Sequence, residues 1–292
     1  MPLDVPIPGD AACVDLRPPA AHAALRPAGA VRLEVQDLLL RPYLLPPRAR
    51  ALVLVGGGAA LLAPVVRALH AAGHAQVVHL PEESWQEHLP PENGPPTRTH
   101  LWEPSPALVR ALAAHGAMLA GRRAFDLACG SGRNAVYLAL QGFEVTAIDR
   151  LPDALEKAAD LARRSGVALH TLELDLEPPG ALAGLGADLV VVVRYLERAL
   201  FATLERVVVP GGLLVYETFT EAQAALGHPR NPRFLLRAGE LRRGFPDLET
   251  LEYEEGFLDG AHVARLVARR PSAPARGEGR ASARISDAGD RK

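Results

Sequence analysis

A glycine-rich stretch in the middle of the chain constrains its fold more than any other feature. The segment 123–128 is short, apolar and bounded by charge, which predicts a buried β-strand, and 133–141 carries apolar residues at helical spacing. Gly130 and Gly132 stand between the two segments. Glycines at a strand-to-helix turn let backbone amides approach a ligand closely at the positive end of the helix. The stretch therefore predicts an α/β unit with a ligand site at this turn.

A second strand is predicted directly after this helix, over 142–149, and it ends in an acid. Asp149 follows the turn by about 20 residues, the spacing at which a carboxylate can accept hydrogen bonds from a ribose diol. A bare turn without a ligand is one interpretation. Another is a nicotinamide or flavin cofactor, since Gly130-x-Gly132-x-x-Ala135 matches the looser form of the dinucleotide fingerprint.

Asp126 favours a third interpretation, because it places a carboxylate four residues before Gly130. A dinucleotide site has an apolar strand at that point and gains nothing from an anion beside its pyrophosphate. A cationic ligand with an ammonium and a sulfonium group tolerates or uses the carboxylate. The stretch therefore favours a nucleoside that carries such a cationic side chain.

The strands predicted further along the chain end in residues suited to the same ligand. A helix is expected over 152–165 and a strand over 167–175. Asp175 and Leu176 then lie where an adenine ring can be bound, although a turn-forming or helix-capping acid is the alternative. Continuous valines in 187–193 predict a central parallel strand that is buried on both faces.

Arg194 and Tyr195 follow this central strand at the edge where open α/β sheets bind ligands. The next strand, predicted over 213–219, begins after a Pro-Gly-Gly turn and carries Glu217 toward the same edge. Two last strands, expected over 248–257 and 261–270, are joined by an Asp-Gly turn, which is typical of a hairpin.

Residues 104–270 resemble class I S-adenosylmethionine-dependent methyltransferases. The features that carry the resemblance are Asp126-x-x-x-Gly130-x-Gly132, Asp149, the Pro-Gly-Gly turn and the closing hairpin. The resemblance implies an α/β fold with a Rossmann-like seven-stranded sheet, an enzyme that transfers methyl groups, and S-adenosyl-L-methionine as cofactor. The cofactor-binding residues it implies are Asp126, Ala128, Gly130, Gly132, Asn134, Asp149, Asp175, Leu176 and Arg194. Tyr195 and Glu217 are the expected catalytic residues on the acceptor side. An NAD(P)-dependent oxidoreductase and a cofactor-binding scaffold without activity remain alternatives.

Segments 194–198, 216–219 and 227–232 resemble the tellurite-resistance and thiopurine-type branch of these enzymes. The loop 227–233 is expected over the carboxyl edge of the sheet, and its guanidinium groups suit anions. A small-molecule acceptor, anionic or a soft chalcogen, is therefore predicted to contact His228, Arg230 and Arg233. In the alternative, these arginines pair with Glu221, Glu240 or the backbone and only hold the loop.

The N-terminal third alternates strands and helices, which predicts a separate small α/β unit. Asp15-x-Arg17, Gly29-Ala30 and the strand-loop-helix over 52–72 resemble a rhodanese-like domain. Gly56 stands where that family carries its nucleophilic cysteine, so the resemblance implies a domain without sulfur-transfer activity. Docking of a protein partner, regulation, and a purely structural role are its expected uses. The predicted organisation is a rhodanese-like domain over 1–96, a methyltransferase domain over 97–270 and a disordered tail over 271–292.

Composition excludes several other classes of protein. Lys and Arg total 32 against 34 Asp and Glu, so the net charge of −2 gives no electrostatic signature of a nucleic-acid binder. The two cysteines and the ten histidines have no spacing that predicts a metal site or a disulfide framework. The apolar run at 51–66 is broken by three glycines and a proline, so no membrane span is predicted, and we expect a soluble, cytoplasmic protein.

Overall fold

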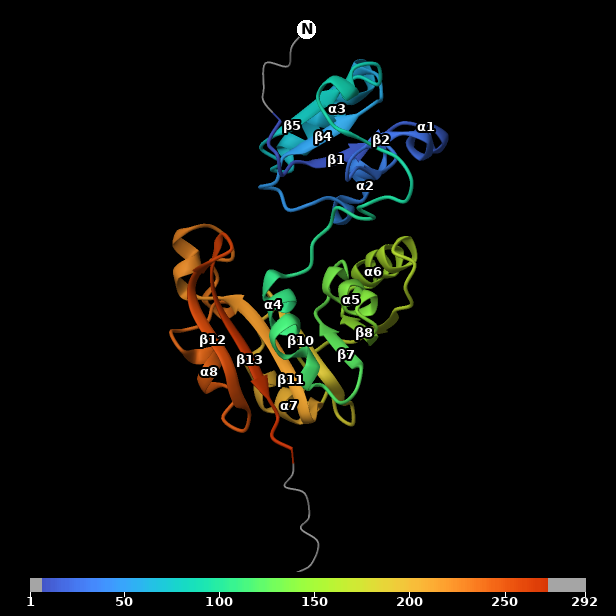
Figure 1. Ribbon diagram of the computed structural model, residues 1–292. Coiled ribbons are helices and arrows are strands. Elements are labelled where there is room, and N and C mark those ends of the chain that lie inside the picture. The colour runs from blue at the N-terminus through green and yellow to red at the C-terminus, as the bar shows by residue number, and fades with distance from the viewer. Residues whose placement is uncertain (1–6, 273–292) are drawn as a thin grey trace, which may run out of the picture.

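The computed structural model describes residues 7–272, which form two α/β units joined by an extended segment (Figure 1). The disordered tail predicted from the sequence lies, from residue 273 onward, outside the described residues. Within 7–272, no helix combines the length and the apolar character needed to cross a membrane.

The N-terminal unit is built on a four-stranded parallel sheet in the order β3-β1-β4-β5. The central strands β1 and β4 are buried at every residue, which explains why their sequences are apolar without alternation, apart from Asp15 at the end of β1. The elements are β1 (Ala12–Asp15), α1 (Pro19–Ala24), β2 (Arg26–Pro27), β3 (Val31–Arg32), α2 (Asp37–Leu40), the 3₁₀ helix η1 (Pro42–Leu44), β4 (Leu52–Val55), α3 (Ala59–Ala71), β5 (Val77–Leu80) and the 3₁₀ helix η2 (Trp85–Glu87).

The proline-rich segment 90–96 begins as part of this unit. β6 (Pro91–Glu92) pairs antiparallel with β2. The Glu92 carboxylate also accepts a hydrogen bond from the Gly29 amide at 2.9 Å. The free connection between the units therefore starts only after this short strand.

The second unit contains the predicted seven-stranded sheet, in the order β12-β13-β11-β10-β7-β8-β9 (Figure 1). The five strands from β11 to β9 are parallel, and the hairpin β12-β13 adds antiparallel to β11, so the sheet is mixed. The elements are α4 (Pro106–His115), η3 (Gly116–Met118), β7 (Arg123–Leu127), α5 (Arg133–Leu140), β8 (Glu144–Asp149), α6 (Pro152–Arg164), β9 (His170–Glu173), β10 (Ala187–Val193), η4 (Arg198–Leu200), α7 (Phe201–Val207), β11 (Val208–Phe219), η5 (Glu221–Ala225), η6 (Pro232–Phe234), α8 (Glu240–Arg243), β12 (Glu249–Leu258) and β13 (Ala261–Arg269).

The central strand β10 and the β12-β13 hairpin match the sequence prediction closely. β10 occupies the centre of the sheet, between β7 and β11, and its valines pack into the cores on both faces. The hairpin turn is formed by Asp259 and Gly260, both with positive φ (46° and 83°), as an Asp-Gly turn requires.

Several elements of the second unit are short. α8 begins only at Glu240, because Gly239 adopts a left-handed conformation directly before it. The 3₁₀ helix η4 and the helix α7 follow one another directly as two separate elements. The strand expected over 167–175 is limited to β9, whose four residues are all exposed because it lies at the edge of the sheet.

The two units share an apolar core. Leu45, Leu101 and Trp102 belong to one buried cluster with Val136 of α5 and Leu161 of α6. Polar contacts surround this cluster: the Tyr43 hydroxyl donates to Asp160 at 2.7 Å, and a guanidinium nitrogen of Arg164 lies 3.3 Å from the Asp37 carboxylate. The N-terminal unit is therefore packed onto helices α5 and α6, and the segment around η1 is fixed beside the glycine-rich turn.

Candidate functional site

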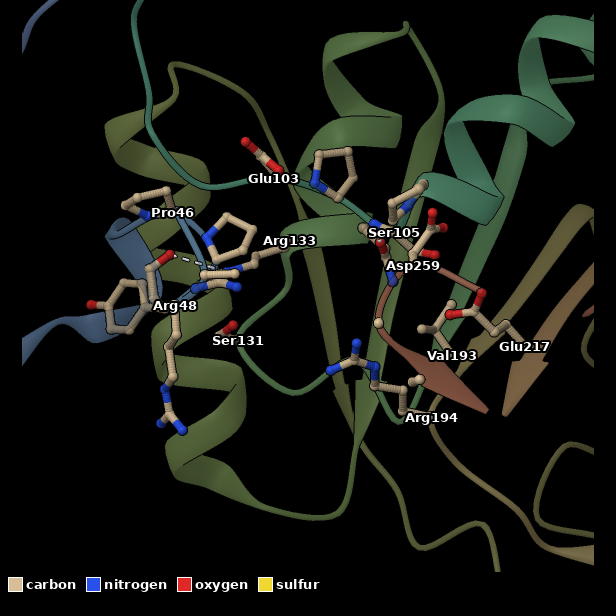
Figure 2. Close-up of a pocket in the computed structure, with 18 of the residues that line it drawn as sticks. Pro46, Arg48, Glu103, Ser105, Ser131, Arg133, Val193, Arg194, Glu217 and Asp259 are labelled. Atoms are coloured by element: carbon tan, nitrogen blue, oxygen red, sulfur yellow. Dashed lines mark hydrogen bonds between the residues drawn. The ribbon is translucent and has the colours of Figure 1, made fainter. Parts of the chain in front are cut away.

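A cavity of about 940 Å³ lies at the carboxyl ends of β7, β10 and β11. The glycine-rich turn, the start of α4, the end of β10 and the β12-β13 turn form one part of its lining. The segment 42–49 of the N-terminal unit and the residues at the end of α3 form the other part (Figure 2). The cavity is thus enclosed by both units.

The glycine-rich turn departs from ordinary backbone geometry at three residues. Ala128, Gly130 and Gly132 all have positive φ, at 53°, 54° and 76°. A Cβ added to Gly130 would meet nothing within 4 Å, so this glycine leaves open space in which a ligand can approach the backbone. A Cβ added to Gly132 would lie 2.5 Å from the Cβ of Ala158 in α6. Gly132 therefore serves the packing of the turn against α6, and Gly130 is the position suited to a ligand.

Asp126 is buried under the turn and does not line the cavity. Its carboxylate accepts a hydrogen bond from the Ala135 amide in the first turn of α5, at 3.0 Å. Burial, with a smaller contribution from the charge of Asp149, raises the pKa of Asp126 to about 7. In this structure Asp126 therefore supports the start of α5, and the role expected from the sequence, contact with an ammonium group, remains a prediction.

Asp149 also holds the turn in place. Its carboxylate accepts hydrogen bonds from the Gly130 amide at 2.9 Å and from the Leu151 amide at 3.0 Å. Asp175 accepts from the Glu177 amide at 3.0 Å, which is the turn-forming contact considered as its alternative role, and Leu176 is buried. None of these three predicted cofactor residues lines the cavity, and neither do Ala128, Gly130 and Gly132; the turn contributes Cys129 and Ser131 to the lining.

Two further predicted cofactor residues do line the cavity. The Asn134 side-chain oxygen accepts a hydrogen bond from the Ser105 amide at 2.8 Å, and so connects α5 to the start of α4. Arg194 has a positive φ of 58°, and its guanidinium lies 5.6 Å from the centre of the Phe219 ring. Its side chain carries a positive charge at the carboxyl end of β10 (Figure 2).

The two predicted catalytic residues occupy different places. Glu217 lines the cavity and forms a buried ion pair with Arg265, which also contacts Asp259 at 2.6 Å. Tyr195 packs partly buried against the core on the α7 side of the sheet and does not line the cavity. Burial and the charge of Glu197 raise the pKa of Tyr195 to about 12, so its hydroxyl stays protonated at neutral pH.

The predicted acceptor loop lies away from the cavity. None of His228, Arg230 and Arg233 is among its lining residues. Arg233 pairs with Glu177 at 3.2 Å and with Glu197 at 3.5 Å. Arg233 therefore holds the loop through ion pairs, as in the alternative interpretation of the sequence. Its partners are Glu177 and Glu197 rather than Glu221 or Glu240.

The sequence interpretation missed the residue that joins the two units at the site. The Arg133 guanidinium donates hydrogen bonds to the carbonyl oxygens of Tyr43, Pro42 and Leu45, at 3.2, 3.3 and 3.3 Å. Burial, and then the neighbouring charge of Arg194, lower the pKa of Arg133. Its place directly after Gly132 was visible in the sequence, but nothing there indicated carbonyl partners about 90 residues earlier.

Comparison with known proteins gives one family match and several partial relatives. Residues 124–212 match the family model described as a methyltransferase domain. Ubiquinone biosynthesis O-methyltransferase of Rickettsia prowazekii (strain Madrid E) is 44% identical over 52 residues, which are 18% of this chain and 21% of that protein. A protein named Hemagglutinin 1, from Eikenella corrodens, is 30% identical over 144 residues, 46% of each chain. The chain thus covers less than half of the length of either curated relative.

Two solved structures align with the chain. TehB from Haemophilus influenzae aligns with a TM-score of 0.47 and 22% identity, over 56% of this chain and 61% of that one. Magnesium protoporphyrin IX methyltransferase (ChlM) from Synechocystis PCC 6803, with bound SAH, aligns with a TM-score of 0.47 and 16% identity, over 56% and 80% of the two chains. The segment that matches the methyltransferase-domain model, residues 124–212, lies within the second unit and includes β7 and β10.

The different surroundings of the two glycines predict different costs of substitution. Gly130→Ala should destabilise the protein by about 1–2 kcal/mol, the cost of a left-handed alanine. Gly132→Ala should have the same backbone cost and should lower the free energy of unfolding by roughly 1–3 kcal/mol more, because its new methyl group collides with Ala158. Urea unfolding of both variants measures the difference. Equal losses would show that Gly132 is not constrained by its packing.

The raised pKa of Asp126 predicts a dependence of stability on pH. The carboxyl holds its proton up to about pH 7 in the folded chain but loses it near pH 3.8, its ordinary pKa, when unfolded. Its contribution to stability is therefore complete below pH 3.8 and is lost as the pH rises to 7. Asp126→Asn should gain stability relative to the wild type as the pH rises from 3.8 to 7, and the gain should level off above pH 7, in paired urea titrations. A difference that does not change between pH 3.8 and pH 7 would argue for a carboxylate ionised throughout.

Proposed function

We propose that this protein transfers the methyl group of S-adenosylmethionine to a small-molecule acceptor bound in the cavity between the two units. The observation that carries the proposal is an overlap: the segment that matches the methyltransferase-domain model includes the turn after β7 and the end of β10. Residues from both places, among them Ser131 and Arg194, line the cavity. The methyl donor and the acceptor would then meet where open α/β sheets bind ligands.

The chemistry is a direct displacement. When bound, S-adenosylmethionine supplies a methyl carbon that its sulfonium makes electrophilic. A lone pair of the acceptor forms a bond to this carbon while the carbon–sulfur bond breaks, which leaves the methylated acceptor and S-adenosylhomocysteine. The contribution of the protein is alignment, which can supply roughly 7–11 kcal/mol in favourable cases.

The proposed cofactor contacts begin with the turn. Gly130 would admit the methionine portion, because the space beside it is open. The Asp149 carboxylate would exchange its present hydrogen bond from the Gly130 amide for those of the ribose hydroxyls. Asp175 and Leu176 would hold the adenine on the far side of β8, as proposed from the sequence.

On the acceptor side, the proposal assigns orientation rather than proton removal. Glu217 is already paired with Arg265, so its carboxylate is better suited to orient a donor group than to act as a general base. Tyr195 lies outside the lining of the cavity and its hydroxyl stays protonated, so it is no general base for an acceptor bound there. Acceptors that need no base, such as a thiolate, a selenide or a carboxylate, fit this site best, in keeping with the tellurite-resistance and thiopurine-type branch.

The N-terminal unit is proposed to be a rhodanese-like domain without sulfur-transfer activity. The loop after β4 is filled: a Cβ on Gly56 would lie 2.6 Å from the side chain of Arg17. His79 contacts the carbonyl oxygens of Gly56 and Gly57 at 3.1 and 3.0 Å. Cys13 is buried, and burial raises the pKa of its thiol to about 12, so it supplies no thiolate at neutral pH.

Cofactor identity is tested by calorimetry on the purified full-length protein. We expect S-adenosylhomocysteine to bind and NAD and NADP not to bind. Asp149→Ala should weaken S-adenosylhomocysteine by about 1.5–3 kcal/mol, the scale of hydrogen bonds to a charged group. Asp153→Ala, which removes an exposed carboxylate four residues later, is the matched control and should leave the affinity unchanged. Tighter binding of NAD would favour the oxidoreductase, and cofactor binding with no product in a metabolite screen with labelled methyl donor would favour the scaffold.

Sulfur transfer by the N-terminal unit is tested with thiosulfate and cyanide. The assay should give only the background rate, because Gly56 replaces the nucleophile and Cys13 is buried. An activity above background that is lost in Cys13→Ser would contradict this part of the proposal.

A further inference from the structure

The acidic residues of the cavity are all paired with arginines. Glu103 contacts Arg50 at 2.7 Å, and Glu217 forms its buried pair with Arg265. Asp259 contacts both Arg265 at 2.6 Å and Arg110 at 3.2 Å. The negative charges in the lining are therefore neutralised by neighbouring guanidinium groups.

Three arginines of the same lining have no carboxylate partner among residues 7–272. Arg133 is held by the three backbone carbonyls of the N-terminal unit. Arg194 lies over the Phe219 ring. Arg48 forms neither a hydrogen bond nor an ion pair with any other described residue. The lining thus carries uncompensated positive charge, contributed by both units.

Two of these charges act on other groups of the lining. Burial, and then the charge of Arg194, lower the pKa of Arg133, so these two guanidinium groups repel each other. Burial, and then the charge of Arg48, lower the pKa of His74, which also lines the cavity. His74 is only 4% exposed, and its Nδ1 has no hydrogen-bond partner in the described part of the chain. A buried polar atom without a partner is costly.

We infer that the cavity is an anion site shared by the two units, in which Arg48 and Arg194 bind an acidic group of the methyl acceptor. Arg48 is brought there by the segment that Arg133 and Tyr43 fix onto the second unit (Figure 2). The acceptor class is a small molecule with a carboxylate, phosphate or similar oxyanion, because guanidinium forks match such groups. The inference rests on the proposed methyl transfer and gives the N-terminal unit a role in recognising the acceptor.

An anion at this place has two sources, the acceptor or the methionine carboxylate of the cofactor. The test therefore uses inorganic phosphate as probe, titrated at constant ionic strength into full-length protein saturated with S-adenosylhomocysteine. Phosphate should bind the wild type, and Arg48→Gln and Arg194→Gln should each weaken it about tenfold or more. Arg48→Lys, which keeps the charge, should recover part of the loss. Arg67→Gln is the matched control, since Arg67 is an exposed arginine of α3 outside the cavity, and it should bind phosphate normally.

The cofactor is measured separately in Arg48→Gln. S-adenosylhomocysteine should keep its affinity within about twofold, as should 5′-methylthioadenosine, which lacks the carboxylate. Loss of S-adenosylhomocysteine binding alone would assign Arg48 to the cofactor and overturn the inference. So would phosphate that binds Arg48→Gln as well as the wild type, or that does not bind the wild type. A wild type that binds phosphate but no S-adenosylhomocysteine would instead reject the methyl-transfer proposal.

Discussion

The contact between Arg133 and the backbone of the N-terminal unit joins the parts of this site. Arg133 is the first residue of α5 and follows Gly132 directly, so its main chain continues the glycine-rich turn. Its guanidinium binds three carbonyl oxygens of the segment that lines the other part of the cavity. One side chain thus fixes the distance between the turn and the wall that faces it. A partly buried cation without a carboxylate is unfavourable unless its donors are satisfied, and the three carbonyls satisfy them.

This contact is effective because it lies beside an apolar core that spans the two units. Leu45 and Trp102 pack with Val136 and Leu161, so the N-terminal unit is not merely tethered by its linker. Burial of such side chains stabilises the packing of the two units by about 25 cal/mol for each Å² of apolar surface removed from water. The surrounding hydrogen bonds fix the orientation of one unit on the other. The cavity consequently has a wall that is present before any ligand binds, which lowers the entropic cost of organising it.

The acids near the turn act as supports for its backbone. Asp126 holds the start of α5 through Ala135, and Asp149 holds Gly130 and Leu151. Each carboxylate accepts from amides that would otherwise lack a partner at the beginning of a helix or at a turn. The left-handed residues of the turn are thereby kept in their unusual conformation, and Gly130 is left with open space beside it.

The local chemistry of the sequence determined the strand-turn-helix, the buried valines of β10 and the Asp-Gly hairpin, because these depend on neighbouring residues alone. It also singled out Asp126 and Asp149 beside the turn, though not the amides that they bind. The sequence could not determine that residues 42–49 face the turn, that Arg48 and Arg194 share a cavity, or that Arg233 pairs away from it. Those relations join residues that are far apart in the sequence, and only tertiary packing brings them together. Periodicity and turn signals report how a segment folds, whereas the position of a guanidinium on a distant carbonyl is decided by tertiary contacts.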